Sequence, residues 1–237
     1  MLSANSRRWF PMIAWRSVKE SSMQEYEQQV KLKFKALSAF YDLFDIPFHL
    51  NRRGNPRLAL AAKIPNQPLR ILDVCIGTAN SAITVSQAND QNEIAGIDLS
   101  PDMIFLAETK IRKRSIRKIS IRQMDAARMS YRDGEFDVVM VSFGLHELDH
   151  ALMMGVLQEM SRVLKESGRL YIIDYEQETG LIKKIILSIH LKIFEPSHMP
   201  QFLQYNWNEI LQKVGLQVTS RDRYLFSKLI SAVKNSA

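Results

Sequence analysis

Strand-like and helix-like segments alternate through the middle of this chain, and this alternation restricts the fold more than any other feature of the sequence. Short runs rich in Ile, Val and Leu are each followed by a stretch with apolar residues at helical spacing. Neighbouring parallel strands need a crossover connection, usually a helix, so the pattern predicts βαβ units in a parallel sheet. The strand-like segments are 70–74, 93–98, 118–124, 136–142 and 169–174, and the helix-like segments between them are 81–89, 101–114 and 151–164.

The C-terminal part of the chain breaks this alternation. After a helix-like segment at 207–214, Gly215 leads into two strand-like segments, 217–223 and 224–233, with no helix between them. Consecutive strands without a crossover favour an antiparallel pair. The sequence therefore predicts an α/β fold with a Rossmann-like, doubly wound, seven-stranded sheet, mostly parallel with an antiparallel C-terminal strand pair. We expect this domain to span 69–237.

The N-terminal region has a different character. Residues 1–22 contain no acid before Glu20 and carry three arginines beside aromatic residues, a composition seen in transit peptides. A disordered basic leader, or a start upstream of the natural one at Met23, is the simpler interpretation and the one we favour. From 23 to about 45 apolar residues recur at helical spacing, and a short helix is expected at 57–63.

The net charge of +7 comes from one short region, which we call the basic patch. Without its seven members, the remaining basic residues equal the 25 acidic ones in number. Such a patch can bind phosphates, but a solvated helix end is the commoner meaning, so nucleic-acid binding is disfavoured. The members of the basic patch are Lys110, Arg112, Lys113, Arg114, Arg117, Lys118 and Arg122.

Composition excludes several classes of protein. The single cysteine rules out an internal disulfide framework and a cysteine-rich zinc site, so we expect no metal and a reducing cytoplasmic location. The longest apolar stretch, 181–194, is interrupted by three lysines and falls short of the roughly 20 residues that span a bilayer. We therefore expect no transmembrane segment.

The stretch "ILDVCIGTAN" (71–80) runs from a predicted strand into a tight turn, where a doubly wound sheet receives its cofactor. A dinucleotide motif G-x-G-x-x-G would put its glycines at Cys75, Gly77 and Asn80, and only one is present. No Lys-Ser or Lys-Thr follows, so a P-loop is excluded. A cofactor without phosphates needs only one close backbone approach together with polar anchors, and this sequence supplies both.

Five stretches in order resemble the motifs of the class I S-adenosylmethionine-dependent methyltransferases. The first motif of that family is close to D-x-G-x-G-x-G, and here Asp73 and Gly77 keep the pattern while Cys75 and Ala79 replace the outer glycines. Each motif is weak alone, but their common order and spacing make the resemblance specific. The other four are "GIDLSPDMI" (96–104), "RQMDAARM" (122–129), "FDVVMVSFGLHEL" (136–148) and "RVLKESGRL" (162–170).

The resemblance implies that the cofactor is S-adenosylmethionine, with S-adenosylhomocysteine as product. Asp98 would accept both ribose hydroxyls and Asp125 the adenine amino group. The alternative for each acid is local: Asp73 capping a turn, Asp98 capping a helix before Ser100, and Asp125 a loop carboxylate. The cofactor-binding residues implied by the resemblance are Tyr41, Asp73, Cys75, Gly77, Asp98, Leu99, Met103, Asp125, Ala126 and Ser142.

Two further regions resemble the subfamily that includes the ubiquinone/menaquinone C-methyltransferases. "SAFYDLFD" (38–45) is similar to its N-terminal lid, which we place at 23–68, and aromatic faces attract a sulfonium. The apolar and aromatic insert at about 178–206 would roof the substrate pocket, which implies a small, partly apolar or aromatic acceptor. Alternatively, Phe40 and Tyr41 are core residues, and the insert is a core helix or the contact of a homodimer.

Methyl transfer from a sulfonium is a direct displacement, so a base is needed only where the acceptor must lose a proton. His146 and Asp174 follow the fourth and fifth strands and are expected to point toward the cleft, with Glu147 and Glu176 as other candidates. The sequence thus predicts methylation of a small molecule. The alternative is a module that binds S-adenosylmethionine or RNA, or an RNA methyltransferase, that uses the basic patch at 110–122.

Overall fold

The computed structural model describes residues 54–177, 180, 198–224 and 226–235. The basic leader, residues 23–53 of the predicted lid with Phe40 and Tyr41, and residues 181–197 of the predicted insert lie outside the described residues. The division of the chain into leader, lid, main domain and insert therefore stays a prediction. In the part of the chain that the structure describes, no helix is both long enough and apolar enough to cross a membrane.

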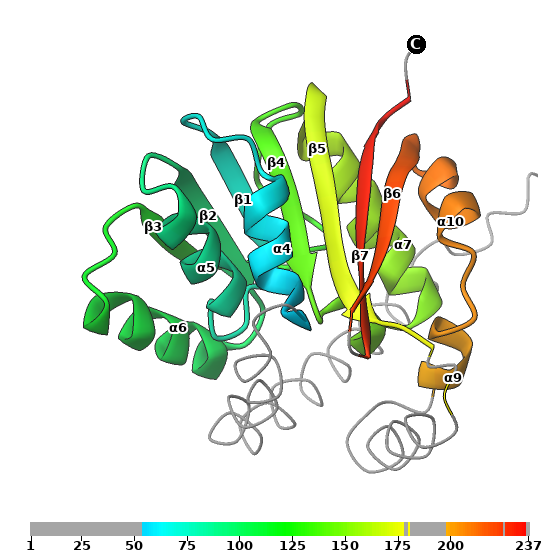
Figure 1. Ribbon diagram of the computed structural model, residues 1–237, viewed down its shortest axis with the longest axis horizontal. Helices are drawn as coiled ribbons and strands as arrows, with labels where there is room; N and C mark the ends of the chain where they lie inside the picture. Colours follow the sequence, from blue (N-terminus) through cyan, green and yellow to red (C-terminus); the bar gives the residue numbers. More distant parts are fainter. Residues whose placement is uncertain (1–53, 178–179, 181–197, 225, 236–237) are drawn as a thin grey trace, which may run out of the picture.

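Seven strands form one sheet, in the order β3-β2-β1-β4-β5-β7-β6. β1 pairs in parallel with β2 and β4, and β7 pairs antiparallel with both β5 and β6 (Figure 1). The predicted fold class is confirmed. The strands are β1 (Arg70–Val74), β2 (Glu93–Asp98), β3 (Ile119–Gln123), β4 (Phe136–Ser142), β5 (Leu164–Tyr175), β6 (Leu216–Tyr224) and β7 (Ser227–Lys234).

Helices cover both faces of the sheet, because successive strand residues point to opposite sides and both sets are apolar. α4, α5 and α6 lie on one face over residues such as Ile71, and α7, α9 and α10 lie on the other over residues such as Leu72 (Figure 1). The helices are α4 (Pro56–Lys63), α5 (Asn80–Ala88), α6 (Pro101–Lys113), α7 (His150–Val163), α9 (Met199–Phe202) and α10 (Trp207–Lys213), with a 3₁₀ turn η2 (Leu145–Glu147).

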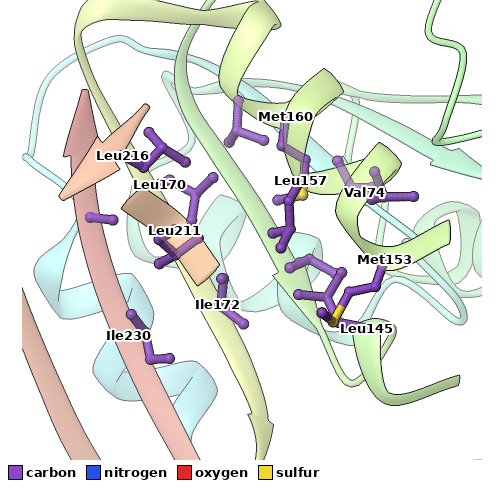
Figure 2. Close-up of a cluster of buried hydrophobic side chains, with 14 of the residues drawn as sticks. Val74, Leu145, Met153, Leu157, Met160, Leu170, Ile172, Leu211, Leu216 and Ile230 are labelled. Carbon is purple, nitrogen blue, oxygen red and sulfur yellow. The ribbon is translucent and has the colours of Figure 1, made fainter. Parts of the chain in front are cut away.

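The larger core cluster lies between the sheet and α7. Figure 2 shows Met153, Leu157 and Met160 of α7 beside Leu170 and Ile172 of β5, all of them fully buried. Met is adaptable in shape and fills irregular gaps between branched neighbours. This packing holds the β4–α7 connection, which carries η2, against the sheet.

The structure corrects two details of the predicted secondary structure. β5 starts at Leu164, directly after α7, and not at residue 169, because "KESG" continues as an irregular strand rather than a turn. A Cβ atom on Gly168 would come within 2.6 Å of the Leu164 side chain, so this irregular part of the strand favours a glycine at residue 168. Neither η2 nor α9 was expected, since each is too short to show a helical period.

Candidate active site

A cavity opens at the carboxyl ends of β1, β2, β3 and β4, at the point where the strand order reverses on either side of β1. This is where open α/β sheets bind their ligands. Tyr41 lies outside the described residues. The nine other predicted cofactor residues all line the cavity: Asp73, Cys75, Gly77, Asp98, Leu99, Met103, Asp125, Ala126 and Ser142.

The turn between β1 and α5 places three residues in the left-handed region. Cys75, Gly77 and Ala79 have φ values of 54°, 53° and 63°, at the three positions where the resembled motif has glycine. A non-glycine residue in this conformation costs about 1 to 2 kcal/mol. The backbone therefore has the left-handed conformation that the motif needs, although Cys75 and Ala79 stand where the family has glycine.

The Cys75 side chain has a matching space on the β4 side of the cavity. A Cβ atom built on Gly144 would lie 2.8 Å from the Cys75 Cβ, so residue 144 has to be glycine while residue 75 carries a side chain. Burial raises the pKa of the Cys75 thiol, which keeps it protonated. Cys75 is thus a neutral wall of the cavity and not a nucleophile.

Asp73, the fourth residue of β1, is a buried carboxylate without a hydrogen-bond partner among the described residues. It is 1% exposed, and burial raises the pKa of its carboxyl from 3.8 to about 8. The nearby Arg57 charge and the Ala82 N–H act in the opposite direction, but neither forms a hydrogen bond with the carboxylate. A buried, unpaired acid that lines a cavity is suited to a cationic ligand.

Asp98 ends β2 and organises the turn opposite to it. Its Oδ2 accepts from the Gly77 N–H at 2.8 Å, and its Oδ1 accepts from the Ser100 N–H at 2.9 Å. The N-cap of α6 is Ser100, whose Oγ accepts from the Met103 N–H, so Asp98 is not the cap of that helix. Burial raises the pKa of the Asp98 carboxyl.

Asp125 follows β3, and its side chain stabilises the loop that carries it. Its Oδ1 accepts from the Ala127 N–H at 2.8 Å, which is the local role that the alternative interpretation assigned to it. The residue nevertheless lines the cavity, and the second carboxylate oxygen forms no hydrogen bond to another described residue. The two roles are compatible, because a carboxylate has about four acceptor sites.

Arg57 is a lining residue that sequence reasoning missed. It sits in the first turn of α4, where Asn55 caps the helix and Pro56 occupies the first position. Its Nε donates to Ser81 Oγ at 3.2 Å, and its guanidinium lies 5.3 Å from the centre of the Phe143 ring. The sequence did single out this arginine, because it starts the otherwise largely apolar segment "PRLALAAK". The neighbouring residues do not show, however, that the Arg57 side chain reaches the cavity.

His146 and Asp174 differ from their predicted placement. Both are buried, at 2% and 0% exposure, and neither lines the cavity. His146 Nδ1 lies 2.7 Å from Asp174 Oδ1, so the two side chains form a pair behind the cavity wall. Of the other candidates, Glu147 lines the cavity, whereas Glu176 is ion-paired with Arg221.

The sequence matches one family of enzymes over most of its length. Residues 22–210 match the model of the ubiE/COQ5 methyltransferase family. The chain belongs to this family. It is an S-adenosylmethionine-dependent methyltransferase, as the order of the five motifs predicted.

Curated relatives of this methyltransferase extend over nearly the same length. The demethylmenaquinone methyltransferase of Geobacillus kaustophilus (strain HTA426) is 31% identical over 205 residues, which cover 84% of this chain and 86% of the relative. The demethylmenaquinone methyltransferase of Alkalihalophilus pseudofirmus is 27% identical over 206 residues, which cover 84% and 85%.

A solved structure shares the fold of this methyltransferase. The 1,6-didemethyltoxoflavin-N1-methyltransferase of Burkholderia thailandensis, with bound 1,6-didemethyltoxoflavin and S-adenosylhomocysteine, superposes with a TM-score of 0.62. It is 14% identical in sequence, and the match covers 89% of this chain and 90% of that one. At this level of identity the likeness concerns the fold alone.

The basic patch of the methyltransferase lies mostly away from the cavity. Arg112, Lys113, Arg114 and Arg117 are exposed around the end of α6 and the approach to β3, at the amino ends of the strands. The patch reaches the cavity through Lys110, whose Nζ donates to Asn80 Oδ1 at 3.0 Å. This position favours the solvated helix end over a role at the reacting centre.

Proposed function

We propose that this methyltransferase methylates a small, partly apolar aromatic acceptor of the quinol type by direct displacement. The observation that carries the proposal is the similarity to demethylmenaquinone methyltransferases over 84% of the chain. The apolar and aromatic composition of the insert at 178–206 also supports it.

The residues of the cavity fit the cofactor that the family uses. We propose that Asp73 takes the ammonium group of S-adenosylmethionine, because it is a buried carboxylate without a partner among the described residues. Asp98 would accept from the ribose hydroxyls and Asp125 from the adenine amino group. The cofactor supplies a methyl group on a sulfonium, which is electrophilic without further activation. The chain then has to align the acceptor and keep water out.

Turnover of a defined acceptor tests the proposal. Purified protein is incubated with S-adenosylmethionine and chemically reduced demethylmenaquinone, and the product is analysed by mass spectrometry. We expect a product heavier by one methyl group, formed together with S-adenosylhomocysteine. The proposal is wrong if this acceptor stays unmodified while RNA becomes methylated under the same conditions.

Asp98→Ala should weaken the binding of S-adenosylhomocysteine by about 1.5 to 3 kcal/mol, since hydrogen bonds to a charged group are lost. The same change frees the Gly77 N–H that Asp98 holds. Calorimetry gives the dissociation constant. Ser100→Ala is the control: it removes the cap of α6 and should lower the free energy of unfolding by about 0.5 to 2 kcal/mol with little effect on binding. Equal binding losses in both variants would contradict the role of Asp98.

Neutralising the exposed part of the basic patch should leave small-molecule turnover unchanged. The triple variant Arg112→Gln, Arg114→Gln, Arg117→Gln keeps Lys110, which contacts the cavity residue Asn80. We expect kcat/KM for reduced demethylmenaquinone to stay within about twofold, because screened surface charges this far from the cavity contribute little. A large loss of turnover, or RNA binding by the wild type with a steep dependence on salt, would instead favour the nucleic-acid alternative.

A further inference from the structure

The end of α6 and its connection to β3 carry positive charge without counter-charges. Arg112, Lys113, Arg114, Arg117 and Lys118 are exposed, and no acid among the described residues forms an ion pair with them. The negative end of the helix dipole favours cations in the last turn of α6, but Arg117 and Lys118 lie beyond the helix. Several basic residues elsewhere are ion-paired instead: Lys63 with Asp222, Arg162 with Glu159, Lys165 with Asp137, Arg221 with Glu176 and Lys234 with Glu166.

Phe105 adds an exposed aromatic ring to this part of the molecule. It lies in the second turn of α6, is 65% exposed, and comes seven residues before Arg112. Residues seven apart occupy the same face of an α-helix, so ring and guanidinium lie on one side of α6. Figure 1 shows α6 on the outside of the molecule, between the end of β2 and the connection to β3. The docking surface, as we call it, consists of Phe105, Arg112, Lys113, Arg114, Arg117 and Lys118.

The docking surface starts beside the cavity and leads away from it, since Met103 in the first turn of α6 lines the cavity. The charge in the cavity is of the opposite kind: among the described lining residues, the acids Asp73, Asp98, Asp125 and Glu147 stand against one basic residue, Arg57.

This contrast in charge decides between the partners that a basic surface can bind. A nucleic acid whose base is methylated would bring its phosphates to the acidic cavity, where they are repelled. A second copy of the chain would place like charges against each other. The headgroups of an anionic bilayer need to reach only the docking surface, and an exposed aromatic ring beside cations suits the boundary between headgroups and acyl chains.

We propose that the docking surface holds this methyltransferase on membranes that contain anionic lipids. The cations lie in the headgroup layer, where the negative surface potential attracts each of them, and the Phe105 ring enters the boundary with the acyl chains. The inference rests on the proposed function in one respect. An apolar acceptor dissolves in a bilayer, so an enzyme bound to that bilayer meets it at a high local concentration.

Vesicle flotation with the full chain tests the inference without any acceptor. We expect the wild type to bind vesicles of equal parts phosphatidylglycerol and phosphatidylcholine, to bind phosphatidylcholine vesicles far less, and to dissociate as the salt concentration rises. The triple variant Arg112→Gln, Arg114→Gln, Arg117→Gln should bind the anionic vesicles about 10- to 100-fold more weakly. Phe105→Ala should bind them about three- to tenfold more weakly, because apolar contact is lost.

Two further variants control for the sign and the place of the charge. Glu108 is exposed on the same face of α6, so Glu108→Gln removes a repelled charge and should strengthen binding about two- to fivefold. The control triple variant Arg169→Gln, Lys213→Gln, Arg223→Gln removes the same charge from exposed residues of β5, α10 and β6, away from the β3 edge of the sheet. It should bind the anionic vesicles as the wild type does.

The inference is overturned if the docking-surface triple variant binds anionic vesicles as tightly as the wild type, or if the wild type binds neutral vesicles equally well. Binding of single-stranded RNA that this triple variant loses, without binding of anionic vesicles, overturns it in favour of a nucleic-acid role. None of these measurements contains an acceptor, so their failure is distinct from failure of the proposed function.

Turnover of demethylmenaquinone in two settings links docking to catalysis. In neutral detergent, the docking-surface triple variant should methylate the reduced acceptor as fast as the wild type. With the acceptor in anionic vesicles, the same variant should be slower by about fivefold or more, because less enzyme is bound. Equal rates of the two proteins on the vesicles would contradict the inference.

Discussion

Asp73→Asn should make the cofactor-free protein more stable and remove most of its affinity for S-adenosylhomocysteine. Burial raises the pKa of the Asp73 carboxyl from 3.8 to about 8, and no described residue forms a hydrogen bond with it. We expect the free energy of unfolding at pH 7 to rise by about 1 to 3 kcal/mol, since the wild type has to protonate this carboxyl when it folds and asparagine does not. Binding should weaken by about 1.5 to 3 kcal/mol, because the partner of the ammonium group is lost.

The direction of the pH dependence follows from the raised pKa. The unfolded state ionises Asp73 near pH 4 and the folded state only near pH 8, so the stability contribution of this carboxyl is lost as the pH rises through this window. The advantage of Asp73→Asn should therefore grow from pH 4 to pH 8. Thermal or urea unfolding at several pH values measures it. Asp90→Asn, an exposed aspartate on the α5–β2 connection, is the control and should change neither stability nor binding.

Proton release gives the same prediction an independent readout. At pH 7 the Asp73 carboxyl of the free protein is mostly protonated, and a cationic ammonium group would ionise it on binding. Calorimetry in two buffers of different ionisation enthalpy should show the wild type releasing a large part of one proton, and Asp73→Asn releasing much less. A destabilised variant that still binds and still releases the proton would contradict the assignment of Asp73.

Lys228→Met should stabilise the protein at neutral pH by about 1 to 3 kcal/mol, because a buried charge is replaced by an apolar side chain of similar length. Lys228 on β7 is 0% exposed, and burial lowers the pKa of its ammonium group from 10.5 to about 8. Its Nζ donates to the Tyr175 carbonyl oxygen and lies 5.1 Å from the ring centres of both Phe202 and Trp207. These contacts reduce the cost of the charge without removing it.

The stability gain of Lys228→Met depends on pH in the opposite direction to that of Asp73→Asn and in a higher pH range. Between pH 8 and 10.5 the unfolded state binds more protons at Lys228 than the folded state, so the wild type gains stability as the pH rises. The difference between Lys228→Met and wild type should be largest below pH 8 and should shrink toward pH 10.5. Lys234→Met on the same strand, where the lysine pairs with the exposed Glu166, is the control and should stay within about 0.5 kcal/mol. A less stable Lys228→Met would show that the contacts of the ammonium group outweigh its burial.

Local patterns predicted most of the fold. β1, β2 and β4 begin and end where the sequence pattern placed them, and α6 starts at Pro101 behind its Ser100 cap. Periodicity and capping act over a few residues, so a single sequence contains them in full. The predicted secondary structure was wrong or incomplete where a segment shows neither a clear period nor a capping pattern, as at the irregular start of β5 and in the short turn η2.

The sequence by itself determined the cofactor class through the resemblance of five stretches, in order, to the motifs of the class I methyltransferases, and Asp73, Asp98 and Asp125 belong to three of these motifs. Only the tertiary structure decided which side chains have partners. It places β7 between β5 and β6, brings Arg57 to the cavity, and buries His146 against Asp174 behind Glu147. The physical reason is that burial and pairing depend on residues far apart in the chain, whereas sequence periodicity records only which face of its own element a residue occupies.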